Sequence, residues 1–570
     1  MKQVLRYLRK YTILLVLSIV CAGVTVVSQL MIPIFTGDAV DLILGKGNVD
    51  FTEIKKILIY MAIAIAITAV SQWVMNLLNK CVTCRVVHDM RRDAFNKLNK
   101  LPLSYLDRKS YGEIVSRMIT DVDQFSEGLL MGLTQFFTGI ITIVMTLIFM
   151  FMLNPLITGL VVVLTPVSLV VAAIIAKKSF HLFQKQSKLR GEQTGFIDEM
   201  IGNKKVLQAF HQEDEMIKRF EVQNEEYRKA SLQAIFASST TNPSTRFVNG
   251  LIYAAVGMFG GFLAINGTIT VGELSCFLSY ANQYTKPFNE ISGVVTEMQN
   301  ALACAKRVFE IIYAEPEKAD AENAVALSEV SGKVELRDVS FSYVPEQRLI
   351  EHLNLLVKPG QKIAIVGPTG CGKTTLINLL MRFYDTTGGK IYIEENEIKD
   401  IKRESLREAF GMVLQDTWIK AGTIRDNILM GNPSATEEEM IEAAKASHAH
   451  GFIRRLPNGY DTVMNEDGGN LSQGQKQLLC IARVMLCKPR MLILDEATSS
   501  IDTRTEIKIQ SAFSRLMEGR TSFIVAHRLT TIQDADCILV MKDGNVIEQG
   551  THDELIGRGG FYSTLYTSNV

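Results

Sequence analysis

The feature that most constrains this chain is a long run of residues without charge. From residue 128 to residue 176 no Asp, Glu, Lys or Arg occurs. A helix needs roughly 20 apolar residues to cross a bilayer, so this run is long enough for two crossings. Asn154 and Pro155 lie near its middle, and this dipeptide is typical of a turn. The sequence therefore predicts two membrane helices joined by a tight turn.

Further uncharged segments occur throughout the first half of the chain. Hydropathy alone does not identify a sixth span, because Glu273 and Lys286 leave only a short uncharged stretch between them. Topology predicts the sixth span, because a basic N-terminus and a C-terminal half that both lie in the cytosol require an even number of crossings. We predict an all-α membrane domain at residues 1–313, with six spans at about residues 11–35, 57–78, 128–153, 156–177, 247–268 and 270–300.

The charges in the connections predict how these helices are oriented. Residues 80–125 and 177–230 carry clusters of Lys and Arg, whereas the connections at Asn154 and at residues 265–270 carry no charge. Basic residues accumulate on the cytosolic side of membrane proteins. We therefore expect a multi-pass protein of the cytoplasmic membrane whose N-terminus and C-terminal half are cytosolic. The two long basic connections are expected to extend the membrane helices into the cytosol.

The helix expected at residues 270–300 combines an aromatic stripe with polar side chains. The aromatic residues at helical spacing are Phe277, Tyr280, Tyr284 and Phe288. The polar residues are Gln283, Lys286 and Glu290. Ionisable residues in membrane helices usually face the bundle interior or a water-filled cavity. Two interpretations stay open for single residues, namely the wall of a substrate cavity and ordinary helix–helix packing.

The second half of the chain has the pattern of an α/β domain. An acidic stretch at residues 314–331 is predicted to be a linker. Beyond it, at residues 332–570, short apolar segments alternate with helical ones, as in α/β proteins. The segments expected to be strands lie at residues 362–366, 411–414, 491–494 and 521–525.

A glycine-rich loop follows the first of these strands and opens a helix. Its pattern, GxxxxGK[ST], is a phosphate-binding loop, in which backbone N–H groups surround phosphates at a helix N-terminus. Lys373 is expected to neutralise the β- and γ-phosphates of ATP, and the Thr374 hydroxyl to ligate Mg²⁺. The residues expected around the nucleotide are Gly367, Pro368, Thr369, Gly370, Cys371, Gly372, Lys373, Thr374 and Thr375.

Two carboxylates end the apolar strand at residues 491–494. Asp495 is placed to hold the Mg²⁺ shell, and Glu496 is expected to act as the general base that takes a proton from the attacking water. His527 follows another apolar strand and fits a group that contacts the γ-phosphate. The predicted catalytic set is therefore Lys373, Glu496 and His527.

In this order the motifs resemble those of ATP-binding cassette (ABC) transporters of the exporter type, in half-size form, over nearly all of the 570 residues. The resemblance implies a six-helix membrane domain joined to an α/β P-loop ATPase domain that is RecA-like with a helical subdomain. The matching motifs are the phosphate loop, Gln415 of the Q-loop, the signature at residues 471–475, Walker B at residues 491–496, the D-loop at residues 499–502 and the H-loop His527.

The same resemblance implies roles for further residues. Tyr343 corresponds to the aromatic residue that stacks on adenine, and Gln415 joins Thr374 and Asp495 as a Mg²⁺ ligand. In the family's dimer, each ATP is held by the phosphate loop of one ATPase domain and the signature of the other. The residues implied in that second contact are Ser472, Gln473, Gly474, Gln475 and Asp502.

Three segments resemble the parts that connect the two domains in this family. Residues 103–113, followed by residues 121–123, resemble the first intracellular loop that docks onto the ATPase. Residues 210–215 occupy the place of the second coupling helix, and residues 466–468 resemble the segment that contacts these loops.

One residue departs from the family pattern. The consensus signature is Leu-Ser-Gly-Gly-Gln, and Gln473 stands at its third position. A side chain there should weaken the site shared with the partner, whereas Glu496 is intact. This asymmetry resembles the glutamate-bearing subunit of heterodimeric bacterial exporters. A second half-transporter is therefore the expected partner, and a heterodimer is preferred to a homodimer.

The function that the resemblance implies is ATP-driven export of amphipathic or hydrophobic, drug- or lipid-like compounds by alternating access. ATP and Mg²⁺ are the expected cofactors, and the bilayer and an amphipathic small molecule are expected partners. Lys plus Arg and Asp plus Glu both number 60, so charge gives no reason to expect a nucleic-acid partner.

Other functions share these motifs. One alternative is an exporter-fold importer of small molecules or siderophores. Another is an ATP-gated channel or regulatory membrane protein, against which the intact Glu496 argues. A soluble DNA-repair ATPase is excluded by the uncharged spans and by the absence of a long coiled-coil insertion.

Overall fold

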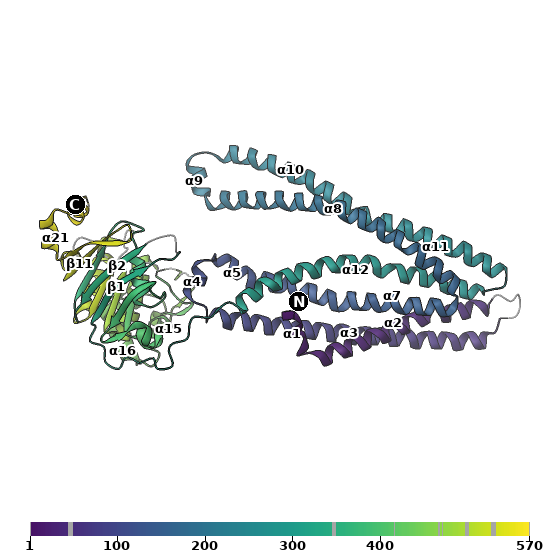
Figure 1. Ribbon diagram of the computed structural model, residues 1–570, viewed down its shortest axis with the longest axis horizontal. Coiled ribbons are helices and arrows are strands. Elements are labelled where there is room, and N and C mark those ends of the chain that lie inside the picture. The colour runs from purple at the N-terminus through teal and green to yellow at the C-terminus, as the bar shows by residue number, and fades with distance from the viewer. Residues whose placement is uncertain are drawn as a thin grey trace. The chain divides into compact units, whose positions relative to one another are not determined.

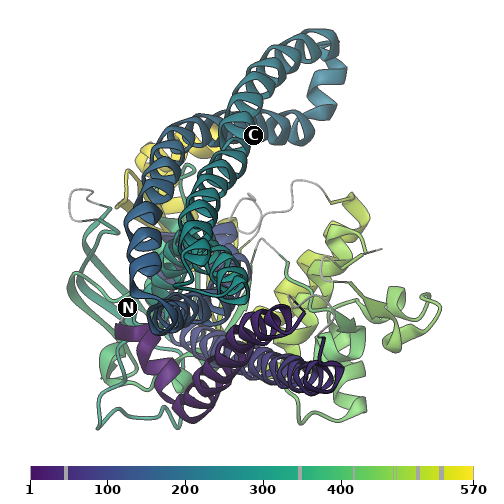
Figure 2. The same cartoon turned by 90° about the vertical axis from the view of Figure 1, so that its right-hand side faces the viewer.

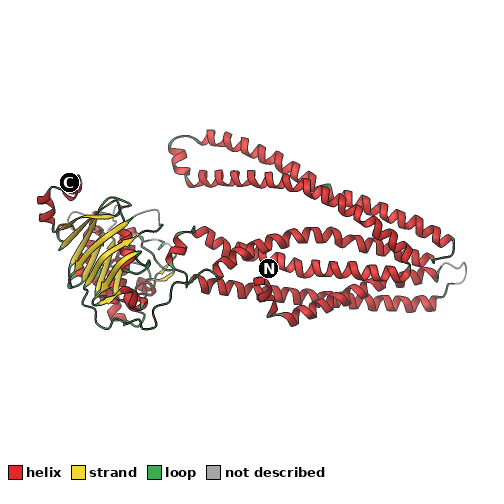
Figure 3. Cartoon of the chain, in the orientation of Figure 1, coloured by secondary structure: helices red, strands yellow, loops and turns green. Residues whose placement is uncertain are grey.

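The computed structural model describes residues 2–43, 49–344, 349–414, 417–465, 468–469, 471–495, 501–525 and 532–568. Contacts divide the chain into two compact units. The helical unit comprises Met1–Leu101 and Lys109–Glu315, and the α/β unit comprises Pro102–Arg108 and Pro316–Val570. Helices make up the first unit, and the strands of the described residues lie in the second (Figure 3). The predicted change from helical to α/β structure is confirmed.

The helical unit is built from long helices joined by short turns (Figure 1). Its helices, together with α4 of the other unit, are α1 (Lys2–Arg9), α2 (Thr12–Asp41), α3 (Phe51–Leu98), α4 (Leu103–Asp107), α5 (Tyr111–Met118), α6 (Thr120–Met131), the π-helical turn η1 (Gly132–Phe136), α7 (Phe137–Leu153), α8 (Pro155–Gly202), α9 (Lys204–Ala209), α10 (Glu213–Ser239), α11 (Thr241–Ile265) and α12 (Val271–Ile312).

Side-chain caps explain where two of the membrane helices begin. The Asn154 side chain accepts hydrogen bonds from the N–H groups of Leu156 and Ile157, and Pro155 occupies the first turn of α8, where no N–H is needed. Thr270 and Glu273 form a reciprocal capping box at the start of α12. The predicted turn between the third and fourth spans is present at Asn154 and Pro155.

By length and composition, four helical stretches of the described chain could cross a membrane. They are Thr12–Asp41, Phe51–Leu98, Tyr111–Leu153 and Glu213–Ile265. Helix α8 begins with a shorter apolar stretch, Pro155–Val167. Each of the six predicted spans lies largely within helix, so the number of crossings stays a prediction that the helix bounds accommodate.

Helices α8 and α10 lie side by side, with the short helix α9 at the turn between them (Figures 1 and 2). The sequence placed such a short helix at residues 210–215, and the structure has it earlier, at Lys204–Ala209. Helix α8 ends at Gly202 with Asn203 as its C-cap, so the chain restarts as α9 at once. Phe210 is then exposed at the turn that leads into α10.

The α/β unit contains a six-stranded sheet with the order β12-β11-β3-β10-β9-β6, a four-stranded antiparallel sheet with the order β2-β1-β4-β5, and a short β7-β8 pair. The strands are β1 (Val334–Phe341), β2 (Ile350–Val357), β3 (Lys362–Val366), β4 (Gly388–Ile393), β5 (Asn396–Glu397), β6 (Phe410–Val413), β7 (Gly422–Thr423), β8 (Val463–Met464), β9 (Met491–Asp495), β10 (Thr521–Val525), β11 (Cys537–Lys542) and β12 (Asn545–Gly550).

Helices cover the sheets and form a separate layer after β6. The helices and 3₁₀ turns of this unit are α13 (Lys373–Leu380), η2 (Ile398–Asp400), α14 (Arg403–Glu408), α15 (Ile424–Leu429), α16 (Glu437–Ala446), α17 (His450–Ile453), η3 (Gly459–Asp461), α18 (Gln473–Cys487), α19 (Thr503–Met517), α21 (His552–Arg558) and α22 (Phe561–Ser568). Apolar residues of α15 to α18 share one buried core with β6, β9 and β10.

The acidic segment that the sequence predicted to be a linker is bound to the α/β unit from Pro316 onward. The Asp320 carboxylate accepts hydrogen bonds from the backbone N–H of Arg403 at 2.9 Å and from its guanidinium at 2.6 Å. Glu317 forms an ion pair with Arg407 at 3.3 Å. Charge complementarity therefore holds this segment against α14.

Candidate functional site

The phosphate loop connects β3 to α13 in the α/β unit. Strand β3 is central in the six-stranded sheet and almost fully buried, so the loop begins at the end of a strand that is held on both sides. Gly372 is the N-cap of α13 and has a positive φ of 101°. Gly367 also has a positive φ, and a Cβ there would lie 2.2 Å from the carbonyl oxygen of Met541. The backbone geometry of the loop thus requires glycine at these positions.

Lys373 turns its amine back into the loop. Its Nζ donates hydrogen bonds to the carbonyl oxygens of Gly367, at 2.7 Å, and Pro368, at 2.9 Å. The side chain is buried, as is Cys371, which packs beneath the loop. A positive charge is thereby fixed beside a helix N-terminus, where backbone N–H groups and the helix dipole already favour anions.

Asp495 lies at the same edge of the sheet as the loop. It ends β9 and is in register with Val525 of β10, and Val525 is in register with Ile365 of β3. The carboxyl ends of parallel strands meet at one edge of a sheet, so the Asp495 carboxylate lies on the side of the sheet where the loop begins, and its predicted role toward Mg²⁺ stays a prediction. Asp495 is buried. A threonine hydroxyl and a carboxylate are oxygen ligands of the kind Mg²⁺ prefers.

Several predicted site residues lie outside the described residues. They are Gln415, Glu496 and His527, together with residues 466–467 and the D-loop residues 499–500. In the sequence, Glu496 directly follows Asp495 at the end of β9, and His527 is two positions beyond the end of β10. Their predicted roles stay predictions.

Tyr343, the predicted adenine-stacking residue, is tied to α13. Its hydroxyl lies 3.2 Å from the Thr375 hydroxyl and accepts a hydrogen bond from the Asn378 amide at 3.3 Å. Its ring also packs edge-to-face on Tyr384, with the centroids 5.0 Å apart. Tyr343 remains partly exposed, so one part of this aromatic side chain is available to a base.

Tyr384 is a residue that the sequence analysis missed. Its ring contacts Phe341 and Tyr343, and its hydroxyl donates a hydrogen bond to the carboxylate of Asp107 on α4. Burial, followed by this bond to a carboxylate, raises the pKa of the Tyr384 hydroxyl, so it stays a donor at neutral pH. The aromatic pair therefore links the nucleotide loop to α4, which the chain connects directly to α3 and α5.

The signature residues form the N-terminus of α18. Ser472 caps this helix, because its hydroxyl accepts from the N–H of Gln475, while the Gln475 side chain accepts from the N–H of Ser472 at 2.9 Å. A Cβ at Gly474 would lie 2.4 Å from a methyl group of Thr505. Glycine at this position is thus required by packing against α19.

Gln473 and Asp502 have local partners in the structure. The Gln473 amide donates a hydrogen bond to the Thr417 hydroxyl at 3.1 Å. Asp502 caps α19 by accepting from the N–H of Thr505 at 2.9 Å. Each residue thus has a structural bond besides its predicted nucleotide contact. For Asp502, the sequence signal for the cap was an acidic residue directly before a helical segment.

Comparison with known proteins relates the whole chain to one family. Residues 15–288 match the model of the ABC transporter transmembrane region, and residues 350–499 match the ABC transporter model. The chain is 40% identical over 569 residues to the uncharacterized ABC transporter ATP-binding protein YfiC of Bacillus subtilis (strain 168), covering 100% of this chain and 94% of that one.

Two further matches extend this comparison. The chain is 41% identical over 523 residues to the fatty acid ABC transporter ATP-binding/permease protein of Mycobacterium bovis (strain ATCC BAA-935 / AF2122/97), covering 91% of this chain and 82% of the other. The structure of a bacterial Atm1-family ABC exporter with ATP bound matches with a TM-score of 0.79 and 27% identity. That match covers 99% of this chain and 98% of that chain.

The substitution Gly367→Ala should disrupt nucleotide binding. A Cβ would meet the Met541 carbonyl and the Cys371 sulfur, so the loop must move or strain. We expect ATP affinity, measured by titration calorimetry on the purified chain, to fall by about tenfold or more, since backbone strain of this kind costs on the order of 1–3 kcal/mol. Gly451→Ala is the control, because a Cβ at Gly451 would meet nothing within 4 Å. Equal affinity of both variants would contradict the assigned loop geometry.

Proposed function

The chain belongs to the ABC transporter family as an exporter half-transporter, and on that premise we propose that it exports amphipathic or hydrophobic, drug- or lipid-like compounds. It is a multi-pass membrane protein and an ATPase coupled to transport. The observation that carries the proposal is the combination, in one chain, of the phosphate loop and a cavity of about 670 Å³ between α2, α3, α7 and α12.

The nucleotide chemistry that we propose starts from the described loop. Lys373 neutralises phosphate charge, and Thr374, Asp495 and Gln415 are the residues that would hold Mg²⁺. When bound, this ion would offset charge on the β- and γ-phosphate oxygens. Glu496 takes the proton of the attacking water, and His527 contacts the γ-phosphate.

Coupling to the helical unit is proposed to run through α4. This helix lies between α3 and α5 in the sequence, yet its contacts place it in the α/β unit. Movement of the α/β unit on ATP binding would therefore pull directly on the chain ends of α3 and α5. ATP can shift the membrane helices only as far as it binds the two conformations with different affinity.

The partner that we propose is a second half-transporter, and a heterodimer is preferred. The Gln473 side chain supports this preference, because it adds bulk beside the N–H groups of the α18 N-terminus and is bonded to Thr417. Six membrane crossings per chain complete the proposed architecture. An importer or an ATP-gated channel with the same fold would differ in the direction or the coupling of transport.

The direction of transport can be read from inside-out vesicles containing the chain. We expect ATP-dependent accumulation of an amphipathic fluorescent dye, and we expect Glu496→Gln to lower it by more than tenfold, because loss of a general base costs about 10²–10⁴ in rate. ATP binding should persist in this variant. Glu518→Gln, an exposed position on the same unit, serves as the control. Dye loss from the vesicles on ATP addition would favour import and contradict the proposal.

The substitution Tyr384→Phe isolates the bond to Asp107. The ring contacts with Phe341 and Tyr343 remain, so ATP affinity should stay within about twofold. The variant loses one hydrogen bond to a charged group, which is worth about 1.5–3 kcal/mol. We expect the ratio of transport to ATP hydrolysis to fall several-fold in proteoliposomes. Tyr392→Phe is the matched control, since the Tyr392 ring contacts the guanidinium of Arg337 on β1. An unchanged ratio would exclude this bond from coupling.

The heterodimer proposal makes a separate prediction about Gln473. If the purified chain alone forms a fully active transporter, the heterodimer is excluded. If a second half-transporter co-purifies, Gln473→Gly should raise ATP turnover of the complex by several-fold. The reason is that glycine removes the side chain beside the backbone N–H groups at the N-terminus of α18. Steady-state phosphate release measures this effect, and lower or equal turnover would contradict the proposed steric cause.

A further inference from the structure

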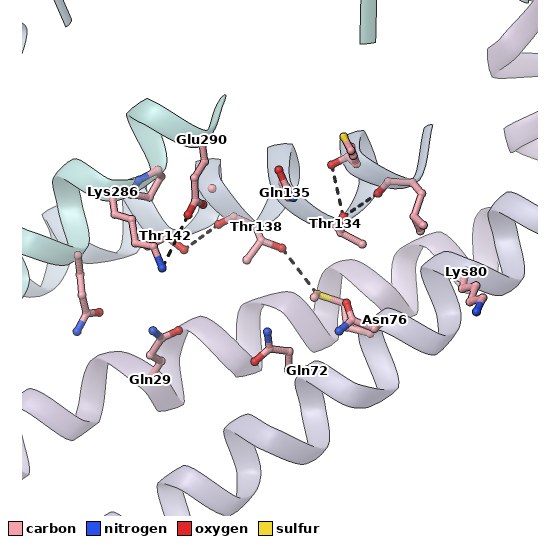
Figure 4. A pocket seen from close by; sticks show the side chains of 16 residues that line it. Gln29, Gln72, Asn76, Lys80, Thr134, Gln135, Thr138, Thr142, Lys286 and Glu290 are labelled. Atoms are coloured by element: carbon pink, nitrogen blue, oxygen red, sulfur yellow. Dashed lines mark hydrogen bonds and ion pairs between the residues drawn. The ribbon is translucent and has the colours of Figure 1, made fainter. Parts of the chain in front are cut away.

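The cavity of the helical unit has an unusually polar wall for a membrane domain. Five carboxamide side chains, from α2, α3, η1 and α12, line it (Figure 4). They are Gln29, Gln72, Asn76, Gln135 and Gln283. All of them except Gln283 lie on helical stretches that are long and apolar enough to cross a membrane, where polar side chains are costly.

The carboxamides and the hydroxyls of this wall differ in whether they have hydrogen-bond partners within the protein. Thr134 and Thr142 donate to carbonyl oxygens of their own helix at 2.8 Å, and Thr138 contacts the Met75 sulfur. Among the described residues, none of the five carboxamides has a side-chain hydrogen-bond partner. Each carboxamide offers two N–H donors and one acceptor oxygen. The unused hydrogen-bonding capacity of this wall is therefore concentrated in neutral amides.

The charged residues of the wall partly cancel. Lys286 and Glu290 lie one turn apart on α12, with Nζ and Oε1 3.8 Å apart. Lys80 lines the wall at the end away from Lys286 and Glu290 (Figure 4). Gln72 and Asn76 lie between these ends on α3 (Figure 4). The centre of the cavity thus presents amides, and its net charge is small.

A local irregularity contributes to this wall. The π-helical turn η1 interrupts the helix between α6 and α7, and Thr134 and Gln135 of this turn line the cavity. Single π-turns in α-helices are rare and occur frequently at functional sites. Here the π-helical turn supplies Gln135, one of the five amides that line the cavity.

We propose that the exported compound is an amphiphile whose headgroup is uncharged and carries several hydrogen-bonding groups, as in a sugar or a short peptide. This inference rests on the proposed export function. Neutral amides can donate to and accept from hydroxyl or amide groups at little desolvation cost, whereas a single ionised head would lack a compensating charge at the centre of the wall. The apolar tail would remain among the apolar side chains of the helices.

The test uses three compounds that share a dodecyl tail and differ in their heads. They are dodecyl maltoside, dodecanoate and dodecyltrimethylammonium, used below their micellar concentrations. The full chain, with its partner if one co-purifies, is reconstituted in lipid vesicles, and ATP hydrolysis is measured against compound concentration. We expect half-maximal stimulation by the maltoside at a concentration at least tenfold lower than for either ionic compound.

The variant Gln72→Met/Asn76→Leu keeps side-chain volume and removes two carboxamides. We expect it to abolish the maltoside preference, whereas the control Gln233→Met, an exposed residue of α10 outside the cavity, should retain it. Equal stimulation by all three heads, a stronger response to an ionic head, or an unchanged preference in the double variant would overturn the proposal. These results would leave export intact if inside-out vesicles still accumulate a dye with ATP. Absence of that accumulation would contradict export itself, and the headgroup proposal with it.

Discussion

The hydrogen bond from Tyr384 to Asp107 is the interaction on which the proposed coupling between nucleotide and membrane helices depends. It ties α4 to the aromatic residues beside the phosphate loop, although 277 residues separate the two partners in sequence. Because α4 lies between α3 and α5 in the chain, the α/β unit includes the segment that joins these two helices of the other unit. In the proposed mechanism, this short helix connects nucleotide chemistry with rearrangement of the membrane helices.

A second constraint is that the bilayer supplies no hydrogen bonds. The helical unit meets it by pairing polar groups between helices. The Ser18 hydroxyl donates to Asn79 at 2.5 Å, and the Tyr280 hydroxyl donates to the Leu30 carbonyl oxygen at 2.6 Å. The carboxamides of the cavity do not follow this pattern. This difference within one bundle is the basis of the proposal that the cavity wall meets a substrate headgroup.

The sequence predicted the parts of the site that depend on local pattern. The positions of the phosphate loop and Asp495 in the chain could be predicted because the loop directly follows the buried strand β3 and Asp495 ends the buried strand β9. The aromatic stripe and the polar residues of α12 left two interpretations open, a substrate cavity wall and helix packing, and the substrate role stays a prediction. Phe277, Tyr280 and Tyr284 pack in the core, whereas Gln283, Lys286 and Glu290 line the cavity.

Other features could not be predicted because they depend on contacts between distant segments. Tyr384 follows α13 without a motif of its own, and only its contact with Asp107 gives it a role. The acidic stretch at residues 314–331 was predicted to be the linker, and its ion pairs with Arg403 and Arg407 could not be predicted because these partners lie far along the chain. The short helix α9 was misplaced by several residues because helix ends depend on capping, which sequence pattern locates only approximately.

The most direct measurement is hydrogen–deuterium exchange of α12 in lipid nanodiscs, with and without ATP, under conditions that prevent hydrolysis. If energy from the phosphate loop reaches the membrane helices through α4, ATP should change exchange around Gln283 to Glu290, and Tyr384→Phe should weaken that response. Identical exchange with and without ATP in the wild-type chain would contradict the mechanical connection.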